Sequence, residues 1–323
     1  MSLKPMKNNT PIITFFLLTG IFFIVTTCTK DKDSEELRKE SLTYILNNDI
    51  SSDTLESLVI WLQDMGTRFM LSDNRRDVAT KIKNRFILMG YPDTRLDSFL
   101  IDKTYRDIDY HQWQYNVIAI LEGNEYPDSI CIIGGHYDNI LKTGDPFSIV
   151  PGANDNASGV AAAMEIARVM MKNNYSPANT IEFIAFGAEE LGLFGSKAYA
   201  GYSNQSSKKI KFMLNNDMIA YQPGSNQSAW TVNIIDYDNS HNLRKDAEQI
   251  CSKFSQLNYI NDNTYNKQSD SYPFFTYGFK ALFFESSQLD PNYHTINDIA
   301  DNCNFEYCCE IVKISCALLI DNN

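Results

Sequence analysis

The chain has 323 residues, of which 44% are apolar, so it can bury a sizeable core and is not a disordered chain. It carries 28 Lys and Arg against 40 Asp and Glu, a net charge of −12. This acidic balance, without a basic patch, argues against nucleic acid as a partner, because phosphate binding needs clustered cations.

The N-terminus reads as a targeting segment. Lys4 and Lys7 are followed by an uncharged, almost wholly apolar run over residues 12–25. That run is short for a membrane span but typical of a signal-peptide core. Residues 25–28 then read Val-Thr-Thr-Cys, which resembles a bacterial lipobox, where the cysteine is lipidated and becomes the new N-terminus.

These features predict how the chain begins. We expect residues 1–28 to be a signal peptide with lipobox Cys28, and residues 29–40 to be a charged, solvated tether. The protein would then be an exported lipoprotein of the outer membrane or periplasm of a bacterium, held to the membrane through lipidated Cys28. Plain secretion and an uncleaved anchor helix remain as alternatives.

The rest of the chain, residues 41–323, is expected to form a single domain. Apolar residues at helical spacing predict N-terminal helices over residues 41–90, which would pack on that domain. Short apolar runs predict strands at residues 117–121, 130–133, 181–186, 211–214, 232–235 and 281–284. Further helices are predicted at residues 160–171, 242–254 and 305–319. Alternating strands and helices indicate an α/β three-layer sandwich, whose mixed sheet is parallel at its centre and flanked by helices.

Side chains that suit chemistry follow several of these strands. Ligands bind beyond the carboxyl ends of strands in such sheets, so these residues are expected to converge. They are His136, Asp155, Glu189, Glu190, Asp217 and His294. Any one of them alone has an ordinary structural explanation. Together, imidazoles and carboxylates suit zinc, and a pair of zinc ions needs a bridging carboxylate. The other two histidines, His111 and His241, are expected to be structural.

The motifs around these residues resemble metallopeptidase family twenty-eight, the co-catalytic zinc aminopeptidases, which also contains the glutaminyl cyclases. The resemblance covers about residues 111–323. Its pieces are Gly-Gly-His136-Tyr-Asp138, Gly-Ala-Asn-Asp155-Asn-Ala-Ser-Gly, Ala-Glu189-Glu190-Leu-Gly-Leu-Phe-Gly-Ser, Asn-Asn-Asp217-Met, Ser269-Asp270-Ser-Tyr-Pro-Phe and Tyr293-His294-Thr.

The resemblance implies a site with two zinc ions per chain. Asp155 would bridge the ions, His136 and Asp217 would complete one ligand set, and Glu190 and His294 would complete the other. The resemblance also implies a zinc aminopeptidase fold and a metallo-aminopeptidase activity on peptide substrates.

Three further roles follow from the same resemblance. Glu189 would be the general base, Asp138 would hold the imidazole of His136, and Tyr293 would contact the substrate carbonyl. A cis peptide bond would join Asp155 to Asn156.

Two other functions stay open at this point. A glutaminyl cyclase-like acyltransferase would use the same fold with one metal ion instead of two. A non-catalytic peptide-binding lipoprotein would have a degenerate site, although all six expected positions hold competent residues. Side-chain specificity, disulfide pairing and oligomeric state cannot be read from the sequence.

Overall fold

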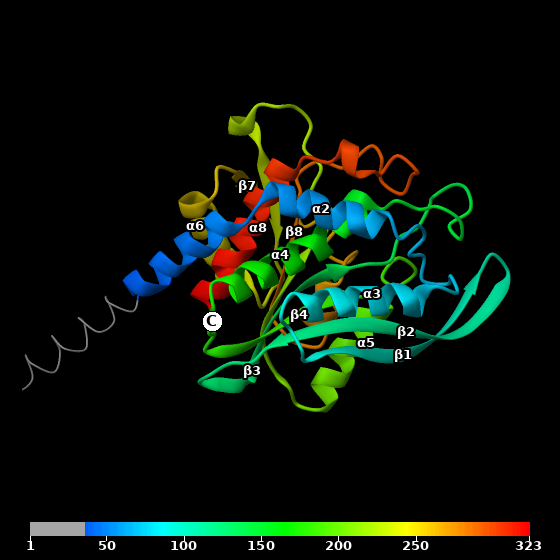
Figure 1. Ribbon diagram of the computed structural model, residues 1–323, viewed down its shortest axis with the longest axis horizontal. Helices are drawn as coiled ribbons and strands as arrows, with labels where there is room; N and C mark the ends of the chain where they lie inside the picture. Colours follow the sequence, from blue (N-terminus) through cyan, green and yellow to red (C-terminus); the bar gives the residue numbers. More distant parts are fainter. Residues whose placement is uncertain (1–35) are drawn as a thin grey trace, which may run out of the picture.

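The computed structural model describes residues 36–323, and its centre is one eight-stranded sheet in the order β1-β2-β4-β3-β5-β8-β6-β7 (Figure 1). Strands β4, β3, β5 and β8 run parallel to one another, while β2 and β6 run antiparallel to their neighbours β4 and β8. The expected mixed sheet with a parallel centre is confirmed. The strands are β1 (Thr94–Tyr105), β2 (Ile108–Leu121), β3 (Tyr126–His136), β4 (Asn179–Phe186), β5 (Lys209–Asn216), β6 (Thr231–Ile235), β7 (Asn258–Ile260) and β8 (Ala281–Ser286).

Helices cover both faces of the sheet, which confirms the three-layer architecture. Residues 36–49 are helical. The later helices are α2 (Ser52–Gln63), α3 (Arg75–Leu88), α4 (Ser158–Lys172), α5 (Phe194–Gln205), α6 (His241–Phe254), α7 (Ser271–Thr276) and α8 (Phe305–Asp321), with the short turns η1 (Ala153–Ala157), η2 (Gln227–Ala229) and η3 (Ala300–Asn302). Helices α2, α3, α4, α6 and α8 bury their apolar residues on one face, and α5 and α7 pack on the other.

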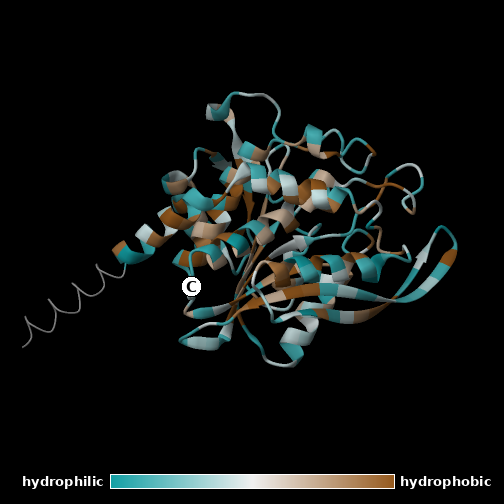
Figure 2. Cartoon of the chain, viewed as in Figure 1, coloured by the Kyte–Doolittle hydropathy of each residue, from teal (hydrophilic) through white to brown (hydrophobic). Residues whose placement is uncertain are grey.

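The alternation of side chains along β3 explains how one strand serves two cores. Cys131 and Ile133 point to the face that α4 covers, and Ile130 and Ile132 point to the opposite face. Strands buried on both faces read as continuous apolar runs, which is why the central strands were predictable. Figure 2 shows the same pattern as brown strands inside mixed brown and teal helices.

Several elements differ from the sequence-based expectation. Strand β1 was not expected, and β2 begins at Ile108, before the expected start at residue 117. Only residues 117–121 of β2 pair with β4, so the rest of the β1–β2 ribbon projects beyond the sheet, as Figure 1 shows. A ribbon with both faces partly in solvent has no continuous apolar run to predict it. The short α5, α7 and β7 were not expected either.

The N-terminal expectations are tested only in part. The signal peptide and Cys28 lie outside the described residues, and so does most of the expected tether. Residues 36–40, also placed in that tether, are helical. The expected N-terminal helices are present and pack on the rest of the domain. Helix α2 packs against α4 and α8, and α3 packs against β1 and β2. Among residues 36–323, no helix combines the length and apolar character that crossing a membrane requires.

Candidate metal centre

The six candidate residues lie together at the carboxyl edge of the parallel strands. His136 is the last residue of β3, and Asp217 comes directly after β5. Asp155 lies in η1, the turn between β3 and α4. The pair Glu189 and Glu190 follows β4. His294 lies in the segment between β8 and α8. Parallel strands end at one edge, so residues far apart in the sequence meet here.

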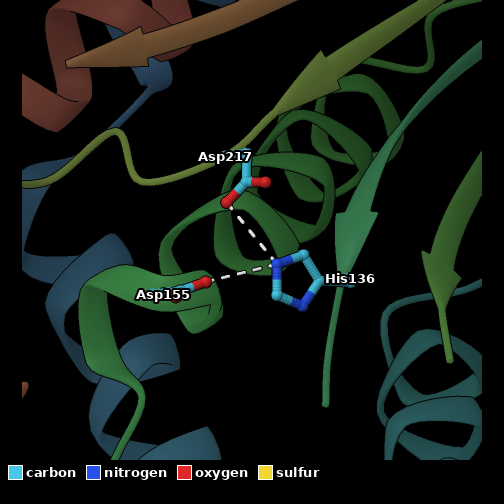
Figure 3. Close-up of side chains that lie close together, drawn as sticks. All are labelled: His136, Asp155 and Asp217. Carbon is cyan, nitrogen blue, oxygen red and sulfur yellow. Dashed lines mark ion pairs between the residues drawn. The ribbon is translucent and has the colours of Figure 1, made fainter. Parts of the chain in front are cut away.

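The first group of ligand atoms is His136, Asp155 and Asp217 (Figure 3). Nε2 of His136 lies 3.3 Å from Oδ1 of Asp155 and 3.5 Å from Oδ1 of Asp217. All three side chains are buried. The figure shows the imidazole at the end of its strand, facing both carboxylates. These three residues are the ligand set expected for one ion.

The second group is Asp155, Glu190 and His294. Nε2 of His294 lies 3.0 Å from Oδ2 of Asp155 and 2.9 Å from Oε2 of Glu190. Asp155 therefore offers Oδ1 to the first group and Oδ2 to the second. This is the arrangement of a carboxylate that bridges two ions.

The charge balance of these groups calls for cations. Burial acts to lower the pKa of His136, yet the carboxylates of Glu189 and Asp217 raise it well above its usual value. Burial likewise opposes ionisation of Asp155, but the imidazoles of His136 and His294 hold its pKa below the usual range. Both shifts have one cause, which is the attraction between the buried carboxylates and positive charge at the imidazoles, so the carboxylates favour a cation at this position.

The donor set and its unpartnered atoms fit zinc. Oδ1 of Asp217, Oε1 of Glu190 and Nε2 of His294 are buried and have no hydrogen-bond partner among residues 36–323, although Nε2 of His294 lies close to two carboxylate oxygens. Nε2 of His294 is therefore near both oxygens, but the geometry is not that of a hydrogen bond. Two ligand atoms about 2.0–2.2 Å from a tetrahedral zinc lie roughly 3.3–3.6 Å apart, near the spacing of the first group. Buried imidazole and carboxylate ligands are what zinc takes in proteins.

Asp138 was expected to hold the imidazole of His136 with its carboxylate, and it contacts the imidazole through its main chain instead. Nδ1 of His136 is 3.1 Å from the main-chain oxygen of Asp138 and 3.7 Å from its carboxylate. The carboxylate instead accepts the main-chain N–H groups of Glu189, at 2.9 Å, and Glu190, at 3.2 Å. Asp138 therefore ties the end of β3 to the turn that carries both glutamates.

Glu189 and Tyr293 line the cavity that opens onto the two groups. The cavity measures about 170 Å³ and is also lined by Met218, Phe283 and Leu289. Burial, with the nearby charges of Glu190, Asp270 and Asp217, raises the pKa of Glu189 well above its usual value, despite the opposing charge of His136. The Tyr293 ring stacks on His294 with centroids 3.7 Å apart, and its hydroxyl makes no hydrogen bond to the described residues.

One supporting residue had no assigned role in the sequence analysis. Ser269 donates a hydrogen bond of 2.6 Å from Oγ to Oδ2 of Asp217, and accepts one from the amide of Asn215. This contact leaves Oδ1 of Asp217 for the first group. The sequence analysis singled out the segment through its Ser269-Asp270 motif. No sequence pattern indicates that a serine will contact a metal-ligand side chain, so the role of Ser269 could not be predicted.

Two smaller expectations can also be compared. The peptide bond between Asp155 and Asn156 is cis, as the resemblance implied. His241 starts α6 and pairs with Asp236. His111 lies inside β2 and pairs with Asp102. Neither histidine belongs to the two groups.

Comparison with known structures supports the fold. The Legionella pneumophila LapA aminopeptidase superposes with a TM-score of 0.74 and 23% identity, covering 87% of this chain and 73% of its own. A Bacteroides thetaiotaomicron glutaminyl cyclase superposes with a TM-score of 0.68 and 15% identity, covering 84% of this chain and 98% of its own. At these identities the likeness concerns the fold alone.

Sequence comparison identifies the family. A probable leucine aminopeptidase 1 of Trichophyton verrucosum is 31% identical over 214 residues, which are 63% of this chain and 57% of the relative. Leucine aminopeptidase 1 of Ajellomyces capsulatus is 24% identical over 300 residues, which are 88% of this chain and 75% of the relative. The chain thus spans little more than half the length of the Trichophyton relative. The model of peptidase family M28 matches residues 116–319, so the chain belongs to that family.

Proposed function

We propose that this chain is a zinc-dependent aminopeptidase that removes N-terminal residues from peptides. The observation that carries the proposal is the pair of ligand groups that share Asp155, next to a cavity that Asp155 and Glu189 both line. The names of the two relatives, both leucine aminopeptidases, support the same activity. His136 and Asp217 would hold one zinc ion, and Glu190 and His294 the other.

Bound zinc would supply Lewis acidity, which polarises a scissile carbonyl and makes an attacking water more acidic. The chain's own residues supply the proton transfers. The Glu189 carboxylate takes a proton from the water as its oxygen forms a bond to the carbonyl carbon. The carbon–nitrogen bond then breaks, and Glu189 gives that proton to the leaving amine. The buried position that raises the pKa of Glu189 suits a group that must hold a proton between these two steps.

The cavity also favours an exopeptidase. Its volume of about 170 Å³ is below the roughly 300–1,000 Å³ of pockets for drug-sized ligands. A space of this size accommodates one amino-acid residue, and an extended peptide would need a longer groove. Met218, Phe283 and Leu289 give the cavity apolar walls, and Tyr293 places a hydroxyl near the reacting groups.

The test is release of leucine from a leucyl peptide by the full-length protein loaded with zinc. Cleavage is expected for the free N-terminus and not for the same peptide with an acetylated amine. Glu189→Gln should lower the rate of release about 10²–10⁴-fold while keeping the metal content. Glu125→Gln, at an exposed glutamate between β2 and β3, should not change the rate of release. A metal-loaded protein that fails on a broad panel of free N-termini would instead favour the peptide-binding lipoprotein.

A glutaminyl cyclase remains the second candidate because one such enzyme shares the fold. The alternative needs a single ion, whereas both ligand groups here are complete. Metal analysis separates the two, with two zinc ions per chain for the peptidase and one for the cyclase. Incubation with a glutaminyl peptide gives a second readout, since a cyclase releases ammonia and leaves pyroglutamate.

We also propose that the protein is exported and anchored to a bacterial membrane through lipidated Cys28. The support is in the sequence, where a signal-like apolar run ends at a lipobox-like tetrapeptide. Feeding cells an alkyne-labelled fatty acid should label the wild-type chain and leave Cys28→Ser unlabelled. Label on the Cys28→Ser chain, or none on the wild type, would exclude this anchor.

A further inference from the structure

The loop that leads to Asp155 is held from two sides by charged residues that contact only its main chain. On one side is Arg68, a fully buried side chain from the segment after α2. Its guanidinium donates to the carbonyl oxygens of Pro151, at 2.9 Å, and Gly152, at 2.7 Å. A side chain at Gly152 would meet this contact, because a Cβ there would lie 2.9 Å from Nη2 of Arg68.

The same guanidinium reaches two other segments. Nε donates to the carbonyl of Tyr137, at 2.7 Å, and Nη1 donates to the carbonyl of Leu62, at 2.9 Å. Tyr137 directly follows the ligand His136. Arg68 therefore sets the distance between the end of β3 and the loop that carries Asp155, using the rigid fork that distinguishes arginine from lysine.

On the other side of the loop is Asp298, which is also buried. Its carboxylate accepts the main-chain N–H groups of Asn154, at 2.7 Å, and Asp155, at 3.0 Å. Its own main-chain oxygen accepts the N–H of Ala153, at 3.0 Å. Asp298 follows His294 in the same segment, so this contact ties the shared carboxylate to the ligand from the far end of the chain.

Arg68 is a buried cation without a paired carboxylate among the residues that the structure describes, which is unusual for an arginine that supports a fold. No carboxylate lies within ion-pair distance of it among residues 36–323, and all four of its side-chain hydrogen bonds go to neutral carbonyls. Burial lowers its pKa to about 10, and the charges of Asp298, Asp138 and Asp155 oppose that shift, so it stays charged at neutral pH. Its positive charge therefore interacts with several nearby carboxylates, among them Asp155 and Glu190, and is not paired with a single one.

We propose that Arg68 and Asp298 are positioning residues for Asp155, with the guanidinium holding the loop by its carbonyls and the carboxyl group holding it by its amides. The inference rests on the proposed function, because it assigns these residues to the carboxylate that would bridge two zinc ions. Supporting groups of this kind change metal affinity by about 10–100-fold when they are removed.

The experiment measures zinc affinity of the full-length protein by competition with a chromophoric chelator, together with the visible spectrum of the cobalt form. Arg68→Met and Asp298→Asn should each weaken zinc binding by about 10–100-fold and alter the cobalt bands. Arg68→Lys keeps the charge but not the fork, and should give a smaller loss. Because both residues act through one loop, the Arg68→Lys/Asp298→Asn double variant should lose less than the product of the single effects.

The matched control is Arg168→Met. Arg168 also donates to a main-chain carbonyl, that of Asp49, but lies toward the C-terminal end of α4, away from η1. It should lower the melting temperature and leave zinc affinity within about twofold, because it touches no part of the site.

Folded variants at both positions that bind zinc as tightly as the wild type, with its cobalt spectrum, overturn the inference. If Arg68→Met and Asp298→Asn do not fold, wild-type affinity in Arg68→Lys overturns it as well. A wild-type protein that holds no zinc would overturn the proposed function instead, so the two failures are distinguishable.

Discussion

Two clusters of buried charge in this molecule differ in how their carboxylates are neutralised. On α4, Glu165 is fully buried and accepts two hydrogen bonds from Arg168, at 2.6 and 2.7 Å, and one from the main-chain N–H of Ser51. At the carboxyl edge of the sheet, Asp155, Glu190 and Asp217 face two imidazoles, and three atoms of these side chains have no hydrogen-bond partner in the described part of the chain. A buried carboxylate with its own cation holds the fold together. Buried carboxylates that converge with no lysine or arginine in ion-pair contact among residues 36–323 form a site for a cation from solution.

The sharpest test of this difference is removal of metal. Excess chelator should abolish peptidase activity and lower the melting temperature, because ions that bind only the folded state stabilise it. One ion at a thousandfold excess over its dissociation constant contributes about 4 kcal/mol. Calorimetry with and without chelator measures the shift, and re-added zinc should reverse it. An unchanged melting temperature and activity would mean that the converging carboxylates hold no ion.

The next largest effect is expected at Glu189. Glu189→Gln removes the proton acceptor but not a ligand, so kcat should fall about 10²–10⁴-fold while zinc content stays at the wild-type level. Loss of zinc in this variant would place Glu189 among the ligands. Metal analysis beside steady-state kinetics distinguishes the two roles.

A smaller effect is expected at the ion pair between Glu165 and Arg168. Arg168→Met leaves Glu165 buried without its cation, and should lower the free energy of unfolding by about 3 kcal/mol, the low end for a broken buried pair because Arg168 is partly exposed. Urea unfolding measures this loss, and kcat should remain within about twofold of the wild type. A change in zinc content would show that the two clusters are not independent.

Glu285 represents a third environment, because its partner is the amide of Asn233 rather than a cation. Burial, opposed by that hydrogen bond and reinforced by the charge of Asp217, raises its pKa from 4.5 to about 7. An acid whose folded pKa is raised costs no stability below pH 4.5, and the cost grows as the pH rises from 4.5 to about 7 and is complete above that.

Glu285→Gln should therefore stabilise the metal-free protein at pH 8 by up to about 3 kcal/mol and have little effect at pH 4. Urea unfolding at the two pH values measures the difference. Equal gains at both would indicate a packing effect without a titration.

The sequence predicted the parts of the molecule where burial is complete. The central strands are apolar on both faces, and the ligands follow them, so both the sheet and the convergence at its edge could be inferred. Strand β1 alternates between partly exposed and exposed residues and has no such signal. Helix α5 contains two glycines and two serines, which are poor helix formers, and its position depends on packing against α7.

Within the site, the residues that could be predicted are those whose own side chains form the two ligand groups, together with Glu189 and Tyr293 beside them. Arg68 and Asp298 contact main-chain groups, and any residue type offers these, so no local pattern marks them. The carbonyl of Asp138 is a similar case, because the main chain rather than the carboxylate approaches His136.

Strand β8 is the last strand in the sequence, yet it lies inside the sheet between β5 and β6, and this order has a consequence for biosynthesis. His294 follows β8 and is the last ligand to leave the ribosome. A nascent chain that ends before this residue has four of the five ligands and lacks the imidazole of the second group. Complete loading of the proposed pair of zinc ions would therefore await the last part of translation.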